Sequence, residues 1–156
     1  MQQMYPYGRA NPRRQDHMYM LSDQGGKPYV VNLARVVRQN NTFRTALWTG
    51  DHLQLTIMSI KPGDDIGLEI HPDDDQMIGV EDGTAIVQMG PHKDKLTFRA
   101  EVSSGYAIFV PAGTWHNIIN TGRRPLKVFS VYAPPHHPFG TIHETKADAE
   151  ADEHKY

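Results

Sequence analysis

The sequence predicts an all-β fold of the sandwich, barrel or jelly-roll type. From Thr42 onwards, short runs of β-branched, aromatic and aliphatic residues alternate with turn signals such as Glu81-Asp82-Gly83. About nine such runs follow one another at strand-like spacing, which is typical of two packed sheets or a barrel. The length of 156 residues suits one domain with its own core, and no internal repeat interrupts the pattern.

The first part of the chain precedes this β pattern. Residues 1–27 contain Pro, Gly and polar residues without an apolar period, which predicts a flexible N-terminal arm. The arm is either disordered or packs its tyrosine and methionine side chains on the barrel or on a neighbouring subunit. These side chains are Tyr5, Tyr7, Met18, Tyr19 and Met20. Residues 28–39 predict a short helix or a strand followed by a turn, since Val30, Leu33, Val36 and Val37 form a helical stripe while valine favours strands.

The strands are expected between residues 42 and 133, and the C-terminal segment follows them. The expected strands are Phe43–Thr49, Leu53–Ile60, Ile66–Ile70, Gln76–Glu81, Thr84–Met89, Leu96–Val102, Tyr106–Val110, Thr114–Asn120 and Leu126–Ala133. The prolines at 134, 135 and 138 then rule out the continuation of a central strand. We assign residues 28–140 to the barrel. Residues 141–156 form a charged C-terminal tail, which is either a short surface helix or a frayed end.

The composition excludes several classes of protein. The formal net charge is -2, from 16 basic and 18 acidic residues, so nothing favours binding to nucleic acid or to an anionic membrane. The chain has no cysteine, which excludes disulfides, thiolate catalysis and thiolate-bound metals. No apolar run approaches the roughly 20 residues of a membrane span. The start of the sequence lacks the apolar block of a signal peptide, so we expect a soluble cytoplasmic protein.

One stretch, Gly63 to Gly83, carries the candidate chemistry. Glu69 and His71 flank a single residue, and on a strand this spacing sends both side chains to the same face. Gln76 follows after an acidic loop, and a later strand supplies His116. Nitrogen and oxygen donors of this kind bind divalent transition metals. The four residues therefore predict a metal pocket inside the barrel, with manganese, iron, zinc, nickel or cobalt as the candidate ion.

Two glycine-framed motifs give the chain a family resemblance. The residues Gly105, Pro111, Gly113, His116 and Asn120 stand at the spacing of the second cupin motif. The first cupin motif is present as a frame of Gly63, position 69, His71, position 76 and Gly83. The chain thus resembles a cupin over roughly residues 42–134, and the resemblance implies a double-stranded β-helix, or jelly-roll, barrel.

The resemblance also implies the metal ligands, with two departures from the family pattern. Carried over position by position, the ligands are Glu69, His71, Gln76 and His116. Glu69 stands where the family usually has its first histidine, and Gln76 stands where it usually has glutamate. The set keeps two imidazoles and one carboxylate, as in a facial triad with open positions. Gln76 is either a weak direct ligand or a group that hydrogen-bonds a bound water or His71.

A narrower resemblance concerns the possible activity. Residues 41–50 and 111–117 are similar to small single-domain bacterial cupins of the mannose-6-phosphate isomerase-like subgroup. This implies a metal-dependent sugar isomerase or epimerase acting on a small carbohydrate or polyol, with Glu69 as the catalytic proton carrier. A metal-dependent dioxygenase and a non-catalytic ligand-binding or self-assembling cupin remain alternatives. We expect a small-molecule ligand and a homodimer, which is common among cupins.

Several other polar residues are assigned structural or surface positions. Asp73, Asp74 and Asp75 are expected to be solvated in a turn, with a position at the mouth of the site as the alternative. His136 and His137 are expected to lie exposed in a proline-rich loop, with closure over the barrel mouth as the alternative. Asn120 is expected to hold a turn. Arg44 and Lys61, the cationic residues nearest the site in the sequence, are expected at the surface.

Overall fold

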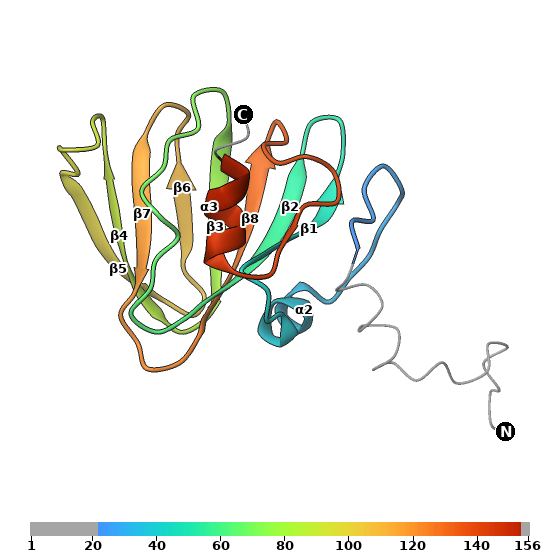
Figure 1. Cartoon of the computed structure of the whole chain (residues 1–156), viewed down its shortest axis with the longest axis horizontal. Helices are drawn as coiled ribbons and strands as arrows, with labels where there is room; N and C mark the ends of the chain where they lie inside the picture. Colours follow the sequence, from blue (N-terminus) through green and yellow to red (C-terminus); the bar gives the residue numbers. More distant parts are fainter. Residues whose placement is uncertain (1–21, 154–156) are drawn as a thin grey trace, which may run out of the picture.

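The protein is all-β, and its strands form two sheets that enclose a core. The structure is a computed structural model and describes residues 22–153. The strands are β1 (Arg44–Thr49), β2 (Gln54–Ile60), β3 (Asp75–Asp82), β4 (Thr84–Gly90), β5 (Phe98–Ser103), β6 (Ala107–Val110), β7 (Trp115–Asn120), β8 (Leu126–Ala133) and β9 (Ile142–His143). A six-stranded sheet has the order β6-β3-β8-β2-β1-β9, and a three-stranded sheet has the order β5-β4-β7 (Figure 1). The expected all-β jelly-roll fold is confirmed.

Side chains alternate between the two faces of each strand, and this alternation produces two separate apolar clusters. Met58 and Ile60 on β2 belong to the core between the sheets, together with Ile78, Val87 and residues of other strands. Ile57, their neighbour in sequence, belongs to a second cluster on the outer face of the six-stranded sheet. Successive side chains of a strand point to opposite faces, so one strand supplies both clusters.

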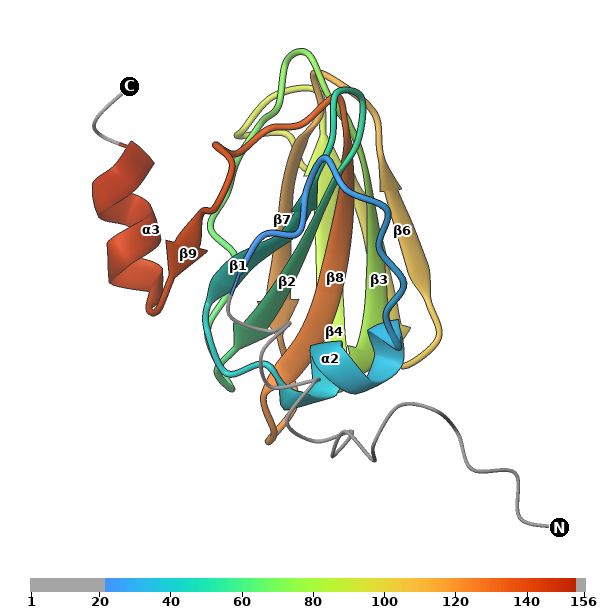
Figure 2. The same cartoon turned by 90° about the vertical axis from the view of Figure 1, so that its right-hand side faces the viewer.

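The short helix α2 (Leu33–Gln39) covers this outer cluster. Its N-cap is Asn32, whose side-chain oxygen accepts a hydrogen bond from the backbone N–H of Arg35. Val36 and Val37 are fully buried against residues of β1 and β2. Figure 2 shows α2 at one end of the six-stranded sheet. The helical alternative therefore holds for residues 33–39, because the apolar stripe has a sheet face to pack on and outweighs the strand preference of valine.

The expected strand Ile66–Ile70 is wrong as a continuous strand. The segment makes two isolated bridges, Asp65 to Ile119 and Glu69 to His116. Between them Gly67 has φ +88°, and its N–H donates to the Asp65 side chain. This left-handed turn interrupts the ladder, because an extended strand cannot include a positive φ.

The last residues that we had assigned to the arm contact the barrel. The N–H of Gln24 donates to the carbonyl of Leu47 at 2.9 Å, and the indole N–H of Trp48 donates to the carbonyl of Lys27 at 2.8 Å. Within the described residues, the barrel's contacts thus begin before residue 28. The tyrosines and methionines of the expected arm lie outside the described residues.

The C-terminal segment forms two further elements. Strand β9 pairs with Arg44 and Thr45 of β1, and helix α3 (Lys146–Glu153) follows it. Figures 1 and 2 show α3 beside the barrel, outside both sheets and next to β9. Ala149 is buried, and the Lys146 ammonium lies 2.9 Å from Asp64 and also contacts Asp65. Of the two alternatives for the tail, the helix is therefore correct over residues 146–153. The helices within 22–153 are too short and too polar to cross a membrane.

Candidate metal centre

Three predicted ligands converge on one carboxylate oxygen. Oε1 of Glu69 lies 3.2 Å from Nε2 of His71 and 3.3 Å from Nε2 of His116. Two donors bound to one metal at about 2.1 Å, with angles of roughly 90–110°, lie about 3.0–3.4 Å apart. Both distances match the separation of two donors on one metal ion, and donor atoms of all three residues lie within 4.8 Å of one another.

Backbone hydrogen bonds hold these side chains in place. The N–H of Glu69 donates to the carbonyl of His116 at 3.0 Å, and the N–H of His116 donates back at 2.9 Å. The N–H of Gly113 donates to the carbonyl of His71 at 2.9 Å. Gly113 has φ +77°, a conformation that favours glycine. The two sequence motifs are thus joined by their main chains next to the metal centre.

The hydrogen bonds of His116 fix its tautomer. Its Nδ1 lies 2.9 Å from the carbonyl of Thr114, which can only accept, so Nδ1 carries the proton. Nε2 of the neutral ring then presents a lone pair towards Glu69, and this buried atom has no hydrogen-bond partner among the described residues. A lone pair facing a carboxylate oxygen is unfavourable unless a cation or proton lies between them. The donor set fits a divalent transition metal.

Glu69 is charged in this environment. Burial raises the pKa of its carboxyl, but the imidazole rings of His116 and His71 beside it lower it more, so the pKa lies well below its ordinary value. Two neutral imidazoles and one carboxylate would leave a bound divalent ion with one net positive charge.

Gln76 lies at the same level of the barrel but has a less definite role. It is buried on β3, where its register partner is Tyr132, and the ring of Tyr132 lies 5.6 Å from that of His71. Its Nε2 donates to the Ser130 hydroxyl at 3.2 Å, and its Oε1 has no donor among the described residues. A buried acceptor without a donor suits either direct ligation or a bond to a metal-bound water, so both alternatives remain predictions.

Comparisons with known proteins identify the family. A family model described as a cupin domain matches residues 56–132. The uncharacterized protein YrkC of Bacillus subtilis (strain 168) is 61% identical over 139 residues, which cover 89% of this chain and 75% of YrkC. The chain belongs to the cupin superfamily. The uncharacterized protein L612 of Acanthamoeba polyphaga mimivirus is 44% identical over 124 residues, covering 79% of this cupin and 75% of L612.

Solved structures agree with this assignment. The crystal structure of BH2720 from Bacillus halodurans has a TM-score of 0.83 and 60% identity, covering 83% of this cupin and 98% of BH2720. TT1209 from Thermus thermophilus has a TM-score of 0.57 and 22% identity, covering 67% of this cupin and 96% of TT1209. The second likeness shows the fold alone. The predicted double-stranded β-helix is thus confirmed, whereas the isomerase-like subgroup is not decided by these comparisons.

The histidine loop of this cupin, residues 134–138, lies beside the candidate metal centre, as in the alternative in which it closes over the barrel mouth, while His136 stays exposed as expected. The ring of His136 lies 4.0 Å from the ring of His71, and its Nδ1 lies 2.7 Å from Oδ2 of Asp74. Asp74, expected to be solvated, is only 6% exposed, whereas Asp73 and Asp75 are exposed as expected. Donor atoms of His71, Asp74 and His136 form a second group within 4.8 Å of one another.

A buried glutamine on β2 holds this loop in place. Gln54 has no exposed surface, and its Oε1 accepts the backbone N–H groups of His136 and His137 at 3.1 and 2.9 Å. Its Nε2 donates to the carbonyl of His137 at 2.8 Å. The sequence offered no local signal for this role, because the three hydrogen bonds join β2 to a loop far away in the chain.

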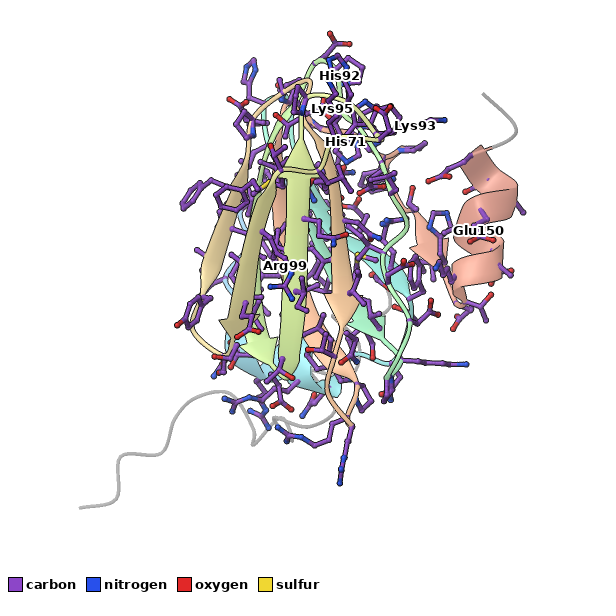
Figure 3. All side chains as sticks on the ribbon, turned by 90° about the vertical axis from the view of Figure 1, so that its left-hand side faces the viewer. His71, His92, Lys93, Lys95, Arg99 and Glu150 are labelled. Carbon is purple, nitrogen blue, oxygen red and sulfur yellow. The ribbon has the colours of Figure 1, made fainter. Side chains whose placement is uncertain are left out.

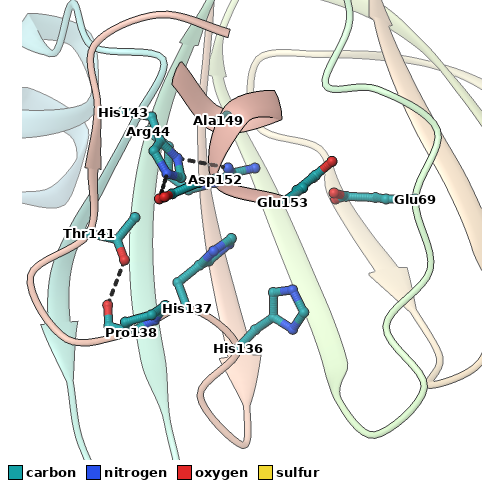
Figure 4. Close-up of a pocket in the computed structure, with 10 residues that line it drawn as sticks. All are labelled: Arg44, Glu69, His136, His137, Pro138, Thr141, His143, Ala149, Asp152 and Glu153. Atoms are coloured by element: carbon teal, nitrogen blue, oxygen red, sulfur yellow. Dashed lines mark hydrogen bonds and ion pairs between the residues drawn. The ribbon is translucent and has the colours of Figure 1, made fainter. Parts of the chain in front are cut away.

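A cavity of about 290 Å³ opens beside Glu69. Figure 4 shows its lining, in which Glu69 lies across from Arg44 and His143, with His136 and His137 below and the α3 residue Ala149 above in this view. Arg44 is 3% exposed, so its predicted surface position is wrong, whereas Lys61 is exposed as predicted. Arg44 is turned inwards because β1 is covered on this side by β9 and α3.

The side chains of His137 and Tyr132, which lie near the cavity, are uncharged at neutral pH. Burial lowers the pKa of His137 to about 2, with smaller contributions from the positive charges of Arg44 and His136. Burial raises the pKa of the Tyr132 hydroxyl to about 12. The permanent charges around the cavity are therefore those of Arg44 and the carboxylates.

Proposed function

We propose that this cupin is a metal-dependent enzyme that acts on a small carbohydrate- or polyol-like molecule, with the metal held by Glu69, His71 and His116. The observation that supports the proposal is the position of Glu69 Oε1, 3.2 and 3.3 Å from the two Nε2 atoms and beside a cavity. A bound divalent metal would polarise a carbonyl and lower the pKa of a neighbouring hydroxyl. The cavity lining is rich in groups that can bind hydroxyls.

Isomerisation or epimerisation is the reaction class that we favour, as in the mannose-6-phosphate isomerase-like cupins. This chemistry moves a proton between adjacent carbons, so it needs a side chain that can take up and return a proton. Glu69, the proton carrier expected from the sequence, can do so only with an oxygen that does not bind the metal. His136 lines the same cavity and lies against Asp74, which makes it a second candidate for this step.

Iron-dependent oxygen chemistry is the second candidate function. Two histidines and one carboxylate around an open position form the ligand set of non-haem iron(II) oxygenases. The three residues at this centre match that set. The choice of metal therefore separates the two proposals, because isomerisation requires no redox change and oxygen activation does.

Metal content is the first experiment. Untagged protein is incubated with manganese, iron(II), zinc, nickel or cobalt, desalted, and measured by elemental mass spectrometry. We expect about one ion per chain in the wild type and much less in Glu69→Gln, His71→Ala and His116→Ala. His52→Ala, which removes an exposed histidine from the β1–β2 turn, is the matched control and keeps its metal. A wild type that binds none of these ions would overturn the metalloenzyme proposal and leave a non-catalytic cupin.

Two assays then separate the reactions. Isomerisation or epimerisation in deuterated water places deuterium on the carbon next to the substrate carbonyl, which NMR detects with a panel of aldoses and ketoses. An oxygenase would instead consume oxygen when loaded with iron(II). The homodimer expected from the sequence also remains a proposal, and light scattering on the purified protein tests it.

A further inference from the structure

Arg44 is a buried cation that lines the cavity and has no carboxylate in contact among the described residues. Its side chain leaves β1 for the cavity, and only 3% of the residue is exposed. Its Nη1 lies 3.2 Å from Nδ1 of His143, and its Nε has no hydrogen-bond partner among the described residues. A buried guanidinium is costly unless an anion compensates it.

None of the carboxylates that line the cavity among the described residues, Glu69, Asp152 and Glu153, forms a direct ion pair with this guanidinium. Nε2 of His143 lies 2.7 Å from Oδ2 of Asp152 on α3, so His143 lies between Asp152 and Arg44 (Figure 4). Because Arg44 can only donate, Nδ1 of His143 accepts and Nε2 carries the proton that faces Asp152. Glu153 also lines the cavity from α3. Glu69 is the inner carboxylate; the positive charge of Arg44 helps to lower its pKa, but its Oε1 faces the two histidines and not the guanidinium.

The other basic side chains lie elsewhere. Arg44 is the only arginine or lysine among the described residues that line this cavity. Figure 3 shows Arg99 on the outer face of β5 and Lys93 and Lys95 in the loop between β4 and β5, away from the barrel interior. A single guanidinium balances the single charge of a carboxylate, and its planar arrangement of N–H groups matches two carboxylate oxygens. A phosphate dianion would leave charge unbalanced here.

We propose that Arg44 binds the carboxylate of a small hydroxy acid in this cavity, opposite Glu69. The Nε atom, which has no hydrogen-bond partner among the described residues, supplies one of the donors. The hydroxyls of the same molecule then extend towards the metal centre, which is the part of the inference that rests on the proposed function. The substrate class is thereby narrowed from polyols in general to polyols that carry a carboxylate.

Binding of glycerate and glycerol tests this assignment. The two probes differ in a carboxylate that replaces a hydroxymethyl group, and ligand-observed NMR measures their binding to metal-free and zinc-loaded protein. We expect glycerate to bind the metal-free wild type more tightly than glycerol. Arg44→Gln should weaken glycerate binding by about tenfold or more and leave glycerol unchanged. Arg44→Lys, which keeps the charge but loses the planar pair of donors, should fall between the wild type and Arg44→Gln.

The controls separate this inference from folding defects and from the metal proposal. Thermal unfolding shows whether Arg44→Gln and Arg44→Lys are folded, and Arg99→Gln removes an exposed arginine without changing glycerate binding. Equal glycerate binding by wild type and a folded Arg44→Gln would overturn the assignment. If inorganic phosphate binds through Arg44 more tightly than glycerate does, the proposal that Arg44 recognises a carboxylate is overturned. The test uses metal-free protein, so it decides the role of Arg44 even if the protein turns out not to bind a metal.

Discussion

Glu69 and His116 are joined twice, by main chain and by side chain. Their backbones exchange two hydrogen bonds of 3.0 and 2.9 Å, and Oε1 of Glu69 lies 3.3 Å from Nε2 of His116. The bridge stands alone in a segment that makes no continuous strand. The carboxylate of Glu69 is thus positioned by β7, the strand that carries His116. This pairing makes the Glu69–His116 side of the centre rigid.

Metal binding should stabilise the fold through this pair. A ligand present at about 100 times its dissociation constant adds about 2.7 kcal/mol to the free energy of unfolding. For a domain of this size the melting temperature should rise by roughly 5–10 °C. Differential scanning calorimetry of wild type and Glu69→Gln with and without zinc measures the effect. A rise of the same size in Glu69→Gln would contradict the assignment of Glu69 as a ligand, while His52→Ala should behave as wild type.

Gln54 should control the position of the histidine loop. Replacing it with alanine leaves two backbone N–H groups and one carbonyl of the loop without their partner. We expect the free energy of unfolding to fall by about 2–4 kcal/mol. Hydrogen exchange should accelerate at the amides of His136 and His137 more than at those of the central strands. Unchanged exchange at these two amides would show that the loop is held by something other than Gln54.

Asn120 should act on stability and not on the metal centre. Its side chain donates to the carbonyls of Ile60 and Arg124 and accepts from the N–H of Gly122, each at 2.9 Å. Asn120→Ala should therefore cost about 2–3 kcal/mol of unfolding free energy in a urea titration. The metal content per folded chain should stay at the wild-type value. A selective loss of metal, with normal stability, would assign Asn120 to the centre instead.

Lys146 should attach α3 over a defined pH range. Its hydrogen bond lowers the pKa of Asp64; burial raises the pKa of Asp65, but hydrogen bonds from Lys146 and Asn117 lower it below its ordinary value. A carboxyl group whose pKa is lower in the folded state stabilises the fold at pH values above its unfolded-state pKa of about 3.9. This stabilisation is lost as the pH falls through the folded-state pKa. Burial lowers the pKa of Lys146, but its bonds to the two aspartates raise it overall, so its contribution is lost only above about pH 10.4.

The measurement compares wild type with Lys146→Met across this range. Because these groups are partly exposed, the difference in unfolding free energy should be at most about 1 kcal/mol. It should be constant between about pH 5 and pH 9 and shrink below about pH 4. A difference that persists at about pH 2 would indicate that the methylene stem of Lys146, and not its charge, fixes the helix.

Much of the fold could be predicted because its signals are local. Turn residues and strand-forming runs gave the sheets, and the spacing of Glu69, His71 and His116 gave three residues that the structure brings within bonding range of one ion. The strand predicted at 66–70 is interrupted at Gly67, whose positive φ breaks a run in which Ile66, Leu68 and Ile70 alternate with Gly67 and Glu69. The residues that sequence reasoning placed wrongly, Arg44 and Asp74, are charged residues that only distant chain segments cover.

The sequence by itself determined the β architecture, the cupin frame and the identity of the candidate ligands, because periodicity, turn chemistry and motif spacing are properties of neighbouring residues. Only the tertiary structure decided that Arg44 faces the cavity and that His136 lies against His71. These positions depend on β9 and α3 covering β1 and on Gln54 binding a loop that follows β8. Whether a charged side chain is buried is set by what packs over it, and that partner can lie anywhere in the chain.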